Sequence, residues 1–409
     1  MDSLKLAGLQ VAGASLLGAV SYYCYNNQST PTKPLKKLAK GVNKNSSIVL
    51  FFNEGGTQCL HHQNHKTDEC PLVDCPVRHL RTLKRIVSKA SSCVDICLYN
   101  LNQVELESAL VDLLRSGKKV RVVVGDRNIE DKEAISRLRS EGAFVVEKCS
   151  KPPPGADLRA LQYAPGDLLM HHKFVIVDSK ILLTGSMNWT NNSFTNNYDH
   201  MLINVDPYLV NQFVEEFQYL FSTESNNEKA YCTQPNGKVP FEAIFFRRNN
   251  FLCRPDANRK KRCEKEDCMF YNYKFILHKI MRASVSVDIC VQQLTAEDLS
   301  NEVIFLHNIG VKVRVMCDKS FSTGTGSQMQ VFINAGIPVH RLEGEGSLHH
   351  KFIIIDGKTL LAGTINWTMQ GFFGNYENLL IIEDKDTVLQ FVKEFEKLWD
   401  VFPAISKVY

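Results

Sequence analysis

One twenty-residue stretch occurs twice in the sequence. Residues 171–190 read HHKFVIVDSKILLTGSMNWT, and residues 349–368 read HHKFIIIDGKTLLAGTINWT. The copies lie 178 residues apart, and the same spacing relates NNYDHMLI to GNYENLLI and QFVEEF to QFVKEF. The string VDIC also precedes both copies, at residues 94–97 and 287–290. A repeat of this extent indicates that each half of the chain forms one structural unit.

Each unit alternates short β-rich runs with amphipathic segments of helical period. In the first half the expected strands are residues 48–52, 94–99, 120–124, 174–177 and 182–184, and the expected helices are residues 78–90, 105–116, 132–141 and 208–220. This alternation predicts an α/β fold. Two runs separated by Ser179 and Lys180 predict a hairpin, so the sheet should be mixed. We expect two tandem domains, each a mixed β-sheet flanked by helices, packed as a pseudo-twofold dimer.

The bulk composition agrees with two globular domains. The 409 residues are 44% hydrophobic, and the net charge of +4 permits an anionic partner without requiring one. The expected organisation is an anchor and basic linker over residues 1–45, a first domain over 46–221, a linker over 222–238 and a second domain over 239–409. The first half also carries a Pro-rich segment just before residue 171, which is either a surface insertion or a lid over the site.

The repeated stretch holds side chains that suit a phosphate group. In an extended strand, residues two positions apart share a face, so His171 should lie beside Lys173, and Ser186 beside Asn188. Lysine, serine and asparagine can donate to phosphate oxygens, and histidine can attack phosphorus or carry a proton near neutral pH. The equivalent residues of the second copy are His349, Lys351, Thr364 and Asn366.

Two such copies would complete one reaction. Covalent cleavage of a phosphodiester needs a nucleophile and an acid that protonates the leaving oxygen. Two halves packed face to face would supply one histidine for each task, so no catalytic metal is expected. A histidine also needs a partner that fixes its tautomer. Asp199 and Glu377, each 28 residues after a motif histidine, are candidates for that role, and a surface carboxylate is the alternative.

The double H-x-K-x4-D pattern resembles the signature of the phospholipase D superfamily. The membrane anchor, the Cys-rich insert and the string GSxNWT resemble its mitochondrial cardiolipin hydrolase branch, known as Zucchini in flies. The resemblance implies two tandem phospholipase D-type domains, in which His171 and His349 act as nucleophile and acid in some order. It implies that the motif lysines and asparagines bind phosphate. The pattern also includes Asp178 and Asp356, which the resemblance implies are usually structural.

This chain departs from that branch in carrying two motifs. Members typically carry one motif and form homodimers, whereas this chain looks like two fused units. The internal pseudo-dimer makes a monomer sufficient, although a homo-oligomer stays possible. The change from Ser186 to Thr364 keeps a hydroxyl group but crowds the second site, so the halves need not be equivalent.

Cysteines gather before the first expected helix of each half. Three thiolates and an imidazole complete a tetrahedral structural zinc site, and the first cluster has them: Cys59, Cys70, Cys75 and His79. The second cluster keeps Cys253, Cys263 and Cys268. Asn272 replaces the histidine there, so we expect a weak or partial site, or one rescued by His278. Free cysteines are the alternative for both clusters.

The N-terminal segment Leu6–Tyr25 has the length and apolar character of a membrane-spanning helix. Four lysines follow it, at positions 33, 36, 37 and 40, which places the body of the protein on the cytosolic side. A short anchor of this kind suits an organelle outer membrane facing the cytosol, which the resemblance implies is the mitochondrial outer membrane, and a cleaved secretory signal is the alternative.

The resemblance leaves the substrate open. The leading hypothesis is an endonuclease acting on single-stranded RNA of the piRNA type, and the alternative is hydrolysis of cardiolipin, an anionic phospholipid, to phosphatidate. An apolar groove beside the histidines would favour a lipid, and polar or basic walls would favour RNA. A catalytically inactive adaptor is a third reading. The basic run at residues 259–262 is either a contact for these anions or a solvated loop.

Overall fold

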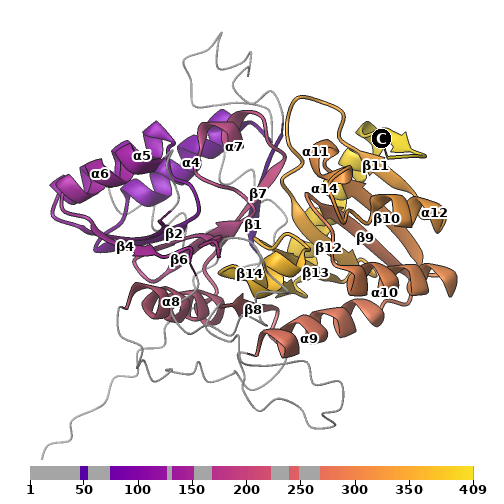
Figure 1. Ribbon diagram of the computed structural model, residues 1–409. Coiled ribbons are helices and arrows are strands. Elements are labelled where there is room, and N and C mark those ends of the chain that lie inside the picture. Colours follow the sequence, from indigo (N-terminus) through magenta and orange to yellow (C-terminus); the bar gives the residue numbers. More distant parts are fainter. Residues whose placement is uncertain are drawn as a thin grey trace, which may run out of the picture.

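Each half of the chain builds its own β-sheet, and the two sheets lie next to each other with helices around them (Figure 1). The computed structural model describes residues 47–53, 74–126, 131–151, 168–222, 239–247 and 268–408. The expected anchor, the 222–238 linker after its first residue, most of the Pro-rich segment and the basic run at residues 259–262 lie outside these ranges.

The first half forms a seven-stranded mixed sheet. Its elements in chain order are β1 (Ile48–Phe52), α4 (Pro76–Ser88), β2 (Cys93–Leu98), α5 (Val104–Arg115), β3 (Lys119–Gly125), α6 (Lys132–Ser140), β4 (Phe144–Lys148), β5 (Lys173–Val177), β6 (Ile181–Gly185), α7 (Asn191–Thr195), β7 (Asp199–Asn204) and α8 (Pro207–Phe221). The strand order is β1-β7-β6-β5-β2-β3-β4. Strands β2, β3 and β4 run parallel, and the other neighbours are antiparallel.

The second half repeats this topology. Its elements are β8 (Phe241–Phe246), α9 (Met269–Met281), β9 (Ser286–Val291), α10 (Glu297–Asn308), β10 (Lys312–Cys317), α11 (Lys319–Ser322), α12 (Met329–Asn334), β11 (Val339–Arg341), β12 (Lys351–Ile355), β13 (Thr359–Gly363), α13 (Met369–Phe373), β14 (Glu377–Ile382), α14 (Lys385–Val401) and β15 (Ala404–Ile405). The order β15-β11-β10-β9-β12-β13-β14-β8 adds only β15 to the pattern of the first sheet. The predicted α/β class, with two mixed sheets, is confirmed.

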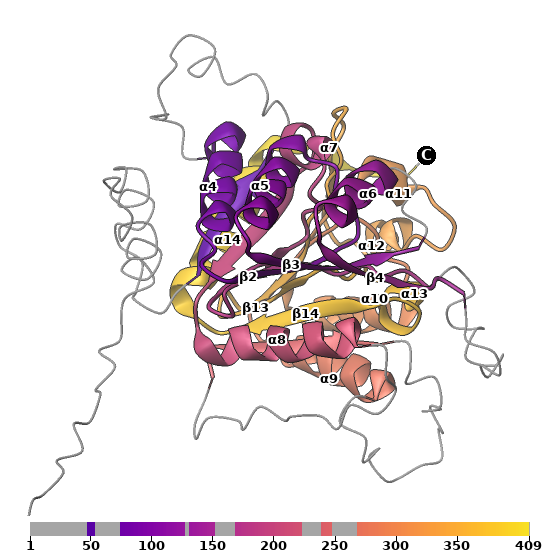
Figure 2. The ribbon, with the colours of Figure 1, turned by 90° about the vertical axis from the view of Figure 1, so that its left-hand side faces the viewer.

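The motif strands are apolar on both faces because helices cover both. Every residue of β5 and of β12 is buried. In the first half, α4, α5 and α6 cover one face of the sheet and α8 covers the other (Figure 2). One apolar core belongs to each half, and a further core in the described residues is shared by both halves and includes side chains of α8 and α14.

The two halves are joined by reciprocal contacts of α8 and α14. Helix α8 packs against β8 of the second half, and α14 packs against β1 of the first half. The Gln212 side chain accepts a hydrogen bond from the backbone N–H of Ala243 at 2.8 Å, and Gln390 accepts one from Val49 at 3.2 Å. Gln212 and Gln390 are equivalent positions of the repeat, so these contacts follow a pseudo-twofold relation.

The predicted hairpin is present, but its turn lies one residue earlier than expected. Asp178 and Ser179 both have φ of 53°, and Lys180 N–H donates to Val177 O at 2.9 Å. Asp356 and Gly357 have φ of 53° and 62° at the same place in the second half. Two consecutive residues with positive φ fit the tight hairpin turns that match sheet twist.

The motif aspartates lie in these turns, away from the histidines. The Asp178 carboxylate accepts hydrogen bonds at 2.7–3.0 Å from the backbone N–H groups of residues 91–93 and from the hydroxyls of Ser91 and Ser92. Asp356 binds the backbone of residues 284–286 in the same way. A five-residue strand separates each aspartate from its histidine, about 20 Å along the chain. These side chains fix the hairpin to the sheet, which fits the structural role that the resemblance implies, and a catalytic role for them stays a prediction.

Replacement of Asp178 with alanine should therefore lower stability more than chemistry. We expect the free energy of unfolding to fall by about 3 kcal/mol, because several charge-assisted hydrogen bonds to the buried Asp178 carboxylate disappear. Urea denaturation measures this change, with Lys180→Ala, an exposed neighbour, as the control. A variant of unchanged stability that has lost activity would instead place Asp178 in catalysis.

Candidate active site

The two motif histidines lie where the backbones of the two halves contact each other. An isolated bridge joins Met170 to Tyr376, and its pseudo-twofold equivalent joins Tyr198 to Leu348. The backbone N–H of His171 donates to the backbone carbonyl oxygen of Tyr376 at 3.0 Å, and the backbone N–H of His349 donates to that of Tyr198 at 2.9 Å. The backbone just before each motif strand is therefore held by the other half.

Each histidine pairs with the carboxylate of the opposite half. The Nδ1 atom of His171 lies 2.7 Å from Glu377 Oε1, and the Nδ1 atom of His349 lies 2.7 Å from Asp199 Oδ1. Both carboxylates are fully buried, so neither is a surface group. A bond at Nδ1 leaves Nε2 as the reactive nitrogen of each ring. The two carboxylates thus occupy the orienting position expected from the sequence, but the pairs are crossed between halves.

The hydroxyl groups of Ser186 and Thr364 donate hydrogen bonds to these carboxylates. Ser186 Oγ donates to Asp199 Oδ1 at 2.6 Å, and Thr364 Oγ1 donates to Glu377 Oε2 at 2.6 Å. The extra methyl group of Thr364 leaves this contact intact. Each hydroxyl already donates its proton to a carboxylate, and the expectation that both bind substrate stays a prediction.

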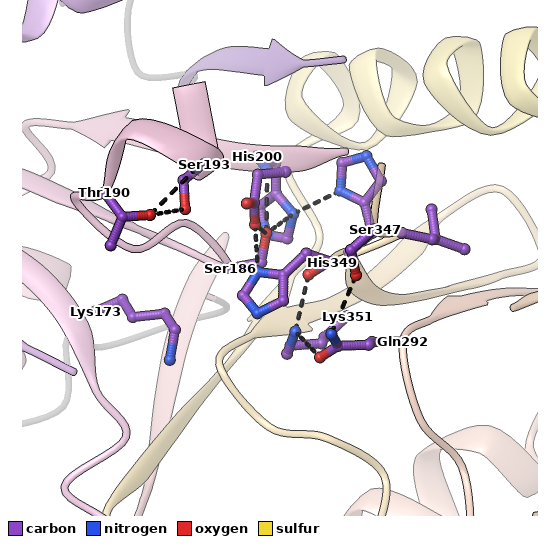
Figure 3. A network of polar contacts seen from close by, with 12 residues as sticks. Lys173, Ser186, Thr190, Ser193, His200, Gln292, Ser347, His349 and Lys351 are labelled. Carbon is purple, nitrogen blue, oxygen red and sulfur yellow. Dashed lines mark hydrogen bonds and ion pairs between the residues drawn. The ribbon is translucent and has the colours of Figure 1, made fainter. Parts of the chain in front are cut away.

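Two buried lysines flank the histidines. Lys173 Nζ donates to the carbonyl oxygen of His171, and Lys351 Nζ donates to that of His349, both at 2.9 Å. Figure 3 shows Lys173 and Lys351 in one close view with His349. The surroundings differ, because Tyr99 places its ring against Lys173 and His171, whereas Gln292 accepts a hydrogen bond from Lys351. Burial lowers the pKa of Lys173 to about 7 and that of Lys351 to about 8. A bound phosphate anion would raise both values.

The two histidine–carboxylate pairs differ in charge. Burial and the charge of Lys173 hold the pKa of His171 well below its usual value, and burial raises the pKa of Glu377 to about 7. Burial also lowers the pKa of His349, but the facing Asp199 opposes that shift. Burial alone would raise the pKa of Asp199, yet the charge and hydrogen bond of His349 bring it to about 2. The ion pair is therefore better supported in the His349–Asp199 pair.

The motif asparagines have side-chain oxygens without a hydrogen-bond partner among the described residues. In both Asn188 and Asn366 this carboxamide oxygen is buried. These oxygens accept hydrogen bonds and cannot donate to a phosphate, so phosphate binding by the NH2 groups of the two asparagines stays a prediction.

A second layer of buried polar groups lies behind the histidines, and sequence reasoning missed it. His200 and His350 stack with their Nδ1 atoms 3.1 Å apart, and Ser186 Oγ lies 3.3 Å from His200 Nδ1. At the equivalent place, the Nδ1 atom of His172 lies 3.0 Å from the Asn378 amide. The doubled histidines at the start of both motif copies were the available signal.

The described part of the first cysteine cluster fits a metal ligand set. Cys75 precedes α4, and His79 lies one turn into that helix, where both of its ring nitrogens are buried without a hydrogen-bond partner among the described residues. Cys59 and Cys70 lie outside those residues. Within the described ranges, no three metal-ligating side chains come together.

The second cluster lacks the corresponding histidine. Asn272 occupies the position of His79 on α9, and Cys268 precedes that helix, whereas Cys253 and Cys263 lie outside the described residues. His278 is exposed and lies ten residues after Cys268, about 15 Å further along the helix. It cannot share a zinc ion with Cys268, so the rescue by His278 is corrected.

Among the described helices, none is both long enough and apolar enough to cross a membrane. Residues 6–25 were not among them.

The family model described as "Cardiolipin synthase, PLD-like domain" matches residues 83–221 and 276–399, which together make up more than half of the chain. Each half thus carries one matching segment, with the two histidines facing the same centre. The chain belongs to the phospholipase D superfamily and is a phosphodiesterase of that kind.

Within the superfamily, its relatives are proteins named mitochondrial cardiolipin hydrolase. The one from Chlamydomonas reinhardtii is 36% identical over 165 residues, which cover 39% of this chain and 74% of the relative. The human one is 39% identical over 127 residues, covering 31% of this chain and 50% of the relative. Among solved structures, a Haemophilus influenzae phosphatidylserine synthase shares the fold, with a TM-score of 0.61 at 12% identity over 91% of this chain and 92% of that one. The branch expected from the sequence is confirmed.

Proposed function

We propose that the chain cleaves phosphodiester bonds through a phosphohistidine intermediate, with His171 as nucleophile and His349 as acid. His171 Nε2 attacks phosphorus, the bond to the leaving oxygen breaks, and His349 Nε2 gives that oxygen its proton. Water then attacks phosphorus and passes a proton to His349 while the phosphorus–nitrogen bond breaks. The two crossed histidine–carboxylate pairs, flanked by Lys173 and Lys351, carry this proposal.

The difference between the pairs supports these roles. An acid must hold a proton before the reaction; burial lowers the pKa of His349, but Asp199 opposes that shift, so His349 is protonated more readily than His171. A nucleophile must be neutral, and the pKa of His171 lies well below that of free histidine. The lysines and the amides of Asn188 and Asn366 would stabilise the charge on the transferring phosphoryl group.

The preferred substrate is single-stranded RNA, with the chain acting as an endonuclease of the piRNA type. Tyr99 contacts His171 and Lys173, and Gln292 contacts Lys351; an aromatic ring and an amide suit a nucleotide better than acyl chains. Hydrolysis of cardiolipin to phosphatidate is the second candidate, because the relatives carry that name.

Labelled single-stranded RNA and cardiolipin vesicles, each incubated with the full chain in EDTA, separate these candidates. We expect RNA cleavage that EDTA does not abolish and that His171→Ala or His349→Ala lowers by at least about 10³-fold. Cleavage of cardiolipin alone would select the second candidate. Absence of both activities would favour the inactive adaptor, and activity that survives both substitutions would exclude the histidine mechanism.

We also place the protein at the mitochondrial outer membrane, with its catalytic body in the cytosol. The apolar segment Leu6–Tyr25 and the lysines after it support this placement, as does the word mitochondrial in the relatives' names. A fluorescent protein fused to residues 1–45 should label the mitochondrial rim, and its secretion would contradict the placement.

The same proposal includes one structural zinc ion, held by Cys59, Cys70, Cys75 and His79. A closed set of four protein ligands would stabilise the start of α4 and leave no position for a catalytic water. Elemental analysis of purified protein should give about one zinc per chain, and His79→Asn, which copies the second half, should remove it. Two zinc ions per chain would show that the second cluster is also complete.

A further inference from the structure

A polar pocket of about 360 Å³ opens beside the motif asparagine of the first half. Its lining consists of Asn100, Asn102, Asn188, Thr190, Asn191, Asn192, Ser193 and Asn197. It adjoins the active site, because Asn100 directly follows Tyr99, whose ring contacts His171. Figure 3 shows two of its lining residues, Thr190 and Ser193, in the same close view as Lys173 and His349.

The lining is six carboxamides and two hydroxyls, so these residues bring neither a charge nor a large apolar side chain. Thr190 and Ser193 are paired with each other, with their hydroxyl oxygens 3.0 Å apart. None of the six carboxamides forms a side-chain hydrogen bond with another described residue, and one amide oxygen, that of Asn188, is buried without a partner. Each carboxamide presents a donor beside an acceptor, so the pocket fits a neutral ligand whose edge alternates acceptors and donors.

The second half keeps Asn366 and Thr368 at these positions but differs at others. Met369 and Gly371 replace Asn191 and Ser193. Asn375, the equivalent of Asn197, is buried and donates to Glu377 Oε1 at 3.0 Å, while its oxygen accepts from the Leu169 N–H. The side chain of Asp199 is one methylene shorter than that of Glu377, and no hydrogen bond joins Asn197 to it in the described residues. Asn197 is therefore left facing the pocket.

We propose that this pocket binds the base of the nucleotide next to the scissile phosphate and so gives the enzyme a base preference. This inference rests on the proposed RNA substrate. Asparagine amides pair with the donor and acceptor edges of unpaired bases, and single-stranded RNA presents those edges freely. The asymmetry of the halves means that one side of the cleaved bond meets the six amides of this pocket, whereas the other side keeps Asn366 and Thr368 but has Met369 and Gly371 in place of Asn191 and Ser193.

The test uses the full chain and single-stranded RNA with a randomised central segment, with the cleaved ends sequenced. The double variant Asn191→Met, Asn192→Ala changes two exposed pocket residues, and Asn211→Ala changes an exposed asparagine of α8 as the matched control. All rates are divided by the rate on bis(4-nitrophenyl) phosphate, which carries no base or ribose.

The wild type and the control should favour one base over the least favoured by about fivefold or more at one position beside the cut. In the double variant this preference should fall below about twofold, and kcat/KM for the favoured RNA should fall about tenfold. An even wild-type distribution, or a preference that survives in the double variant, would overturn the inference while the RNA activity stands. A wild type that cleaves the small diester but no RNA removes the proposed substrate and this inference together. Loss of cardiolipin hydrolysis in the double variant, with RNA cleavage unchanged, would assign the pocket to a lipid headgroup instead.

Discussion

His171→Ala should abolish release of 4-nitrophenol from a 4-nitrophenyl phosphodiester, whereas His349→Ala should still release about one equivalent per chain in a rapid burst. The nitrophenolate leaves without a proton, so loss of the acid does not block the first step. The second step does need His349, because water must lose a proton as it attacks. Turnover after the burst should therefore fall by about 10²–10⁴-fold in His349→Ala, and by about 10⁴-fold or more in His171→Ala.

Rapid mixing with absorbance detection measures the burst, and thermal denaturation verifies that both variants fold. The same variants on RNA, whose leaving oxygen needs protonation, should both be inactive. A burst in His171→Ala and none in His349→Ala would reverse the assigned roles. A burst in neither would mean that both histidines act before the first bond breaks.

Glu377→Gln should behave as a weaker form of His171→Ala, and Asp199→Asn as a weaker form of His349→Ala. Each amide would hold its histidine in the wrong tautomer and no longer support its charge, which costs about 10³-fold in the step that the histidine serves. Glu377→Gln should therefore suppress the nitrophenol burst. Asp199→Asn should retain it and slow the turnover that follows.

This result distinguishes crossed pairs from pairs within one half. If Asp199 served His171, its substitution would remove the burst, and that outcome would falsify the crossed arrangement. Glu297→Gln, at an exposed position of α10, is the control and should leave both phases unchanged.

The sequence predicted the motif strands because β5 and β12 are continuous apolar runs, which indicate strands covered on both faces. It did not predict β7 as a strand, since Asp199, His200 and Asn204 break the apolar pattern of DHMLIN. All three are buried in the structure: Asp199 and His200 contact His349 and His350 of the other half, and Asn204 donates to Ser47 of its own half. The tertiary contact decides this strand, and a local pattern could not show it.

In the site too, the local sequence pattern could not show which residues of the two halves come into contact. Spacing within each copy identified Asp199 and Glu377 as partners of the histidines, but it could not say which histidine each one meets. That choice depends on the bridges between residues 170 and 376 and between residues 198 and 348. Ser186 and Thr364 were assigned to the substrate because their hydroxyls can donate to phosphate, and only the structure shows that the carboxylates already take those protons.

Crossed pairing gives the fusion of two units a distinct meaning. A homodimer must meet its partner by diffusion, so dilution separates its paired catalytic groups, whereas a tether keeps the second unit at a high effective concentration. In a homodimer every substitution also appears twice, on both sides of the bond to be cut. Here a substitution changes only one of the two halves, so one half can carry Glu377 while the other carries Asp199, whose side chain is one methylene shorter. The tether therefore allows one half to specialise in attack and the other in proton transfer without either losing its partner.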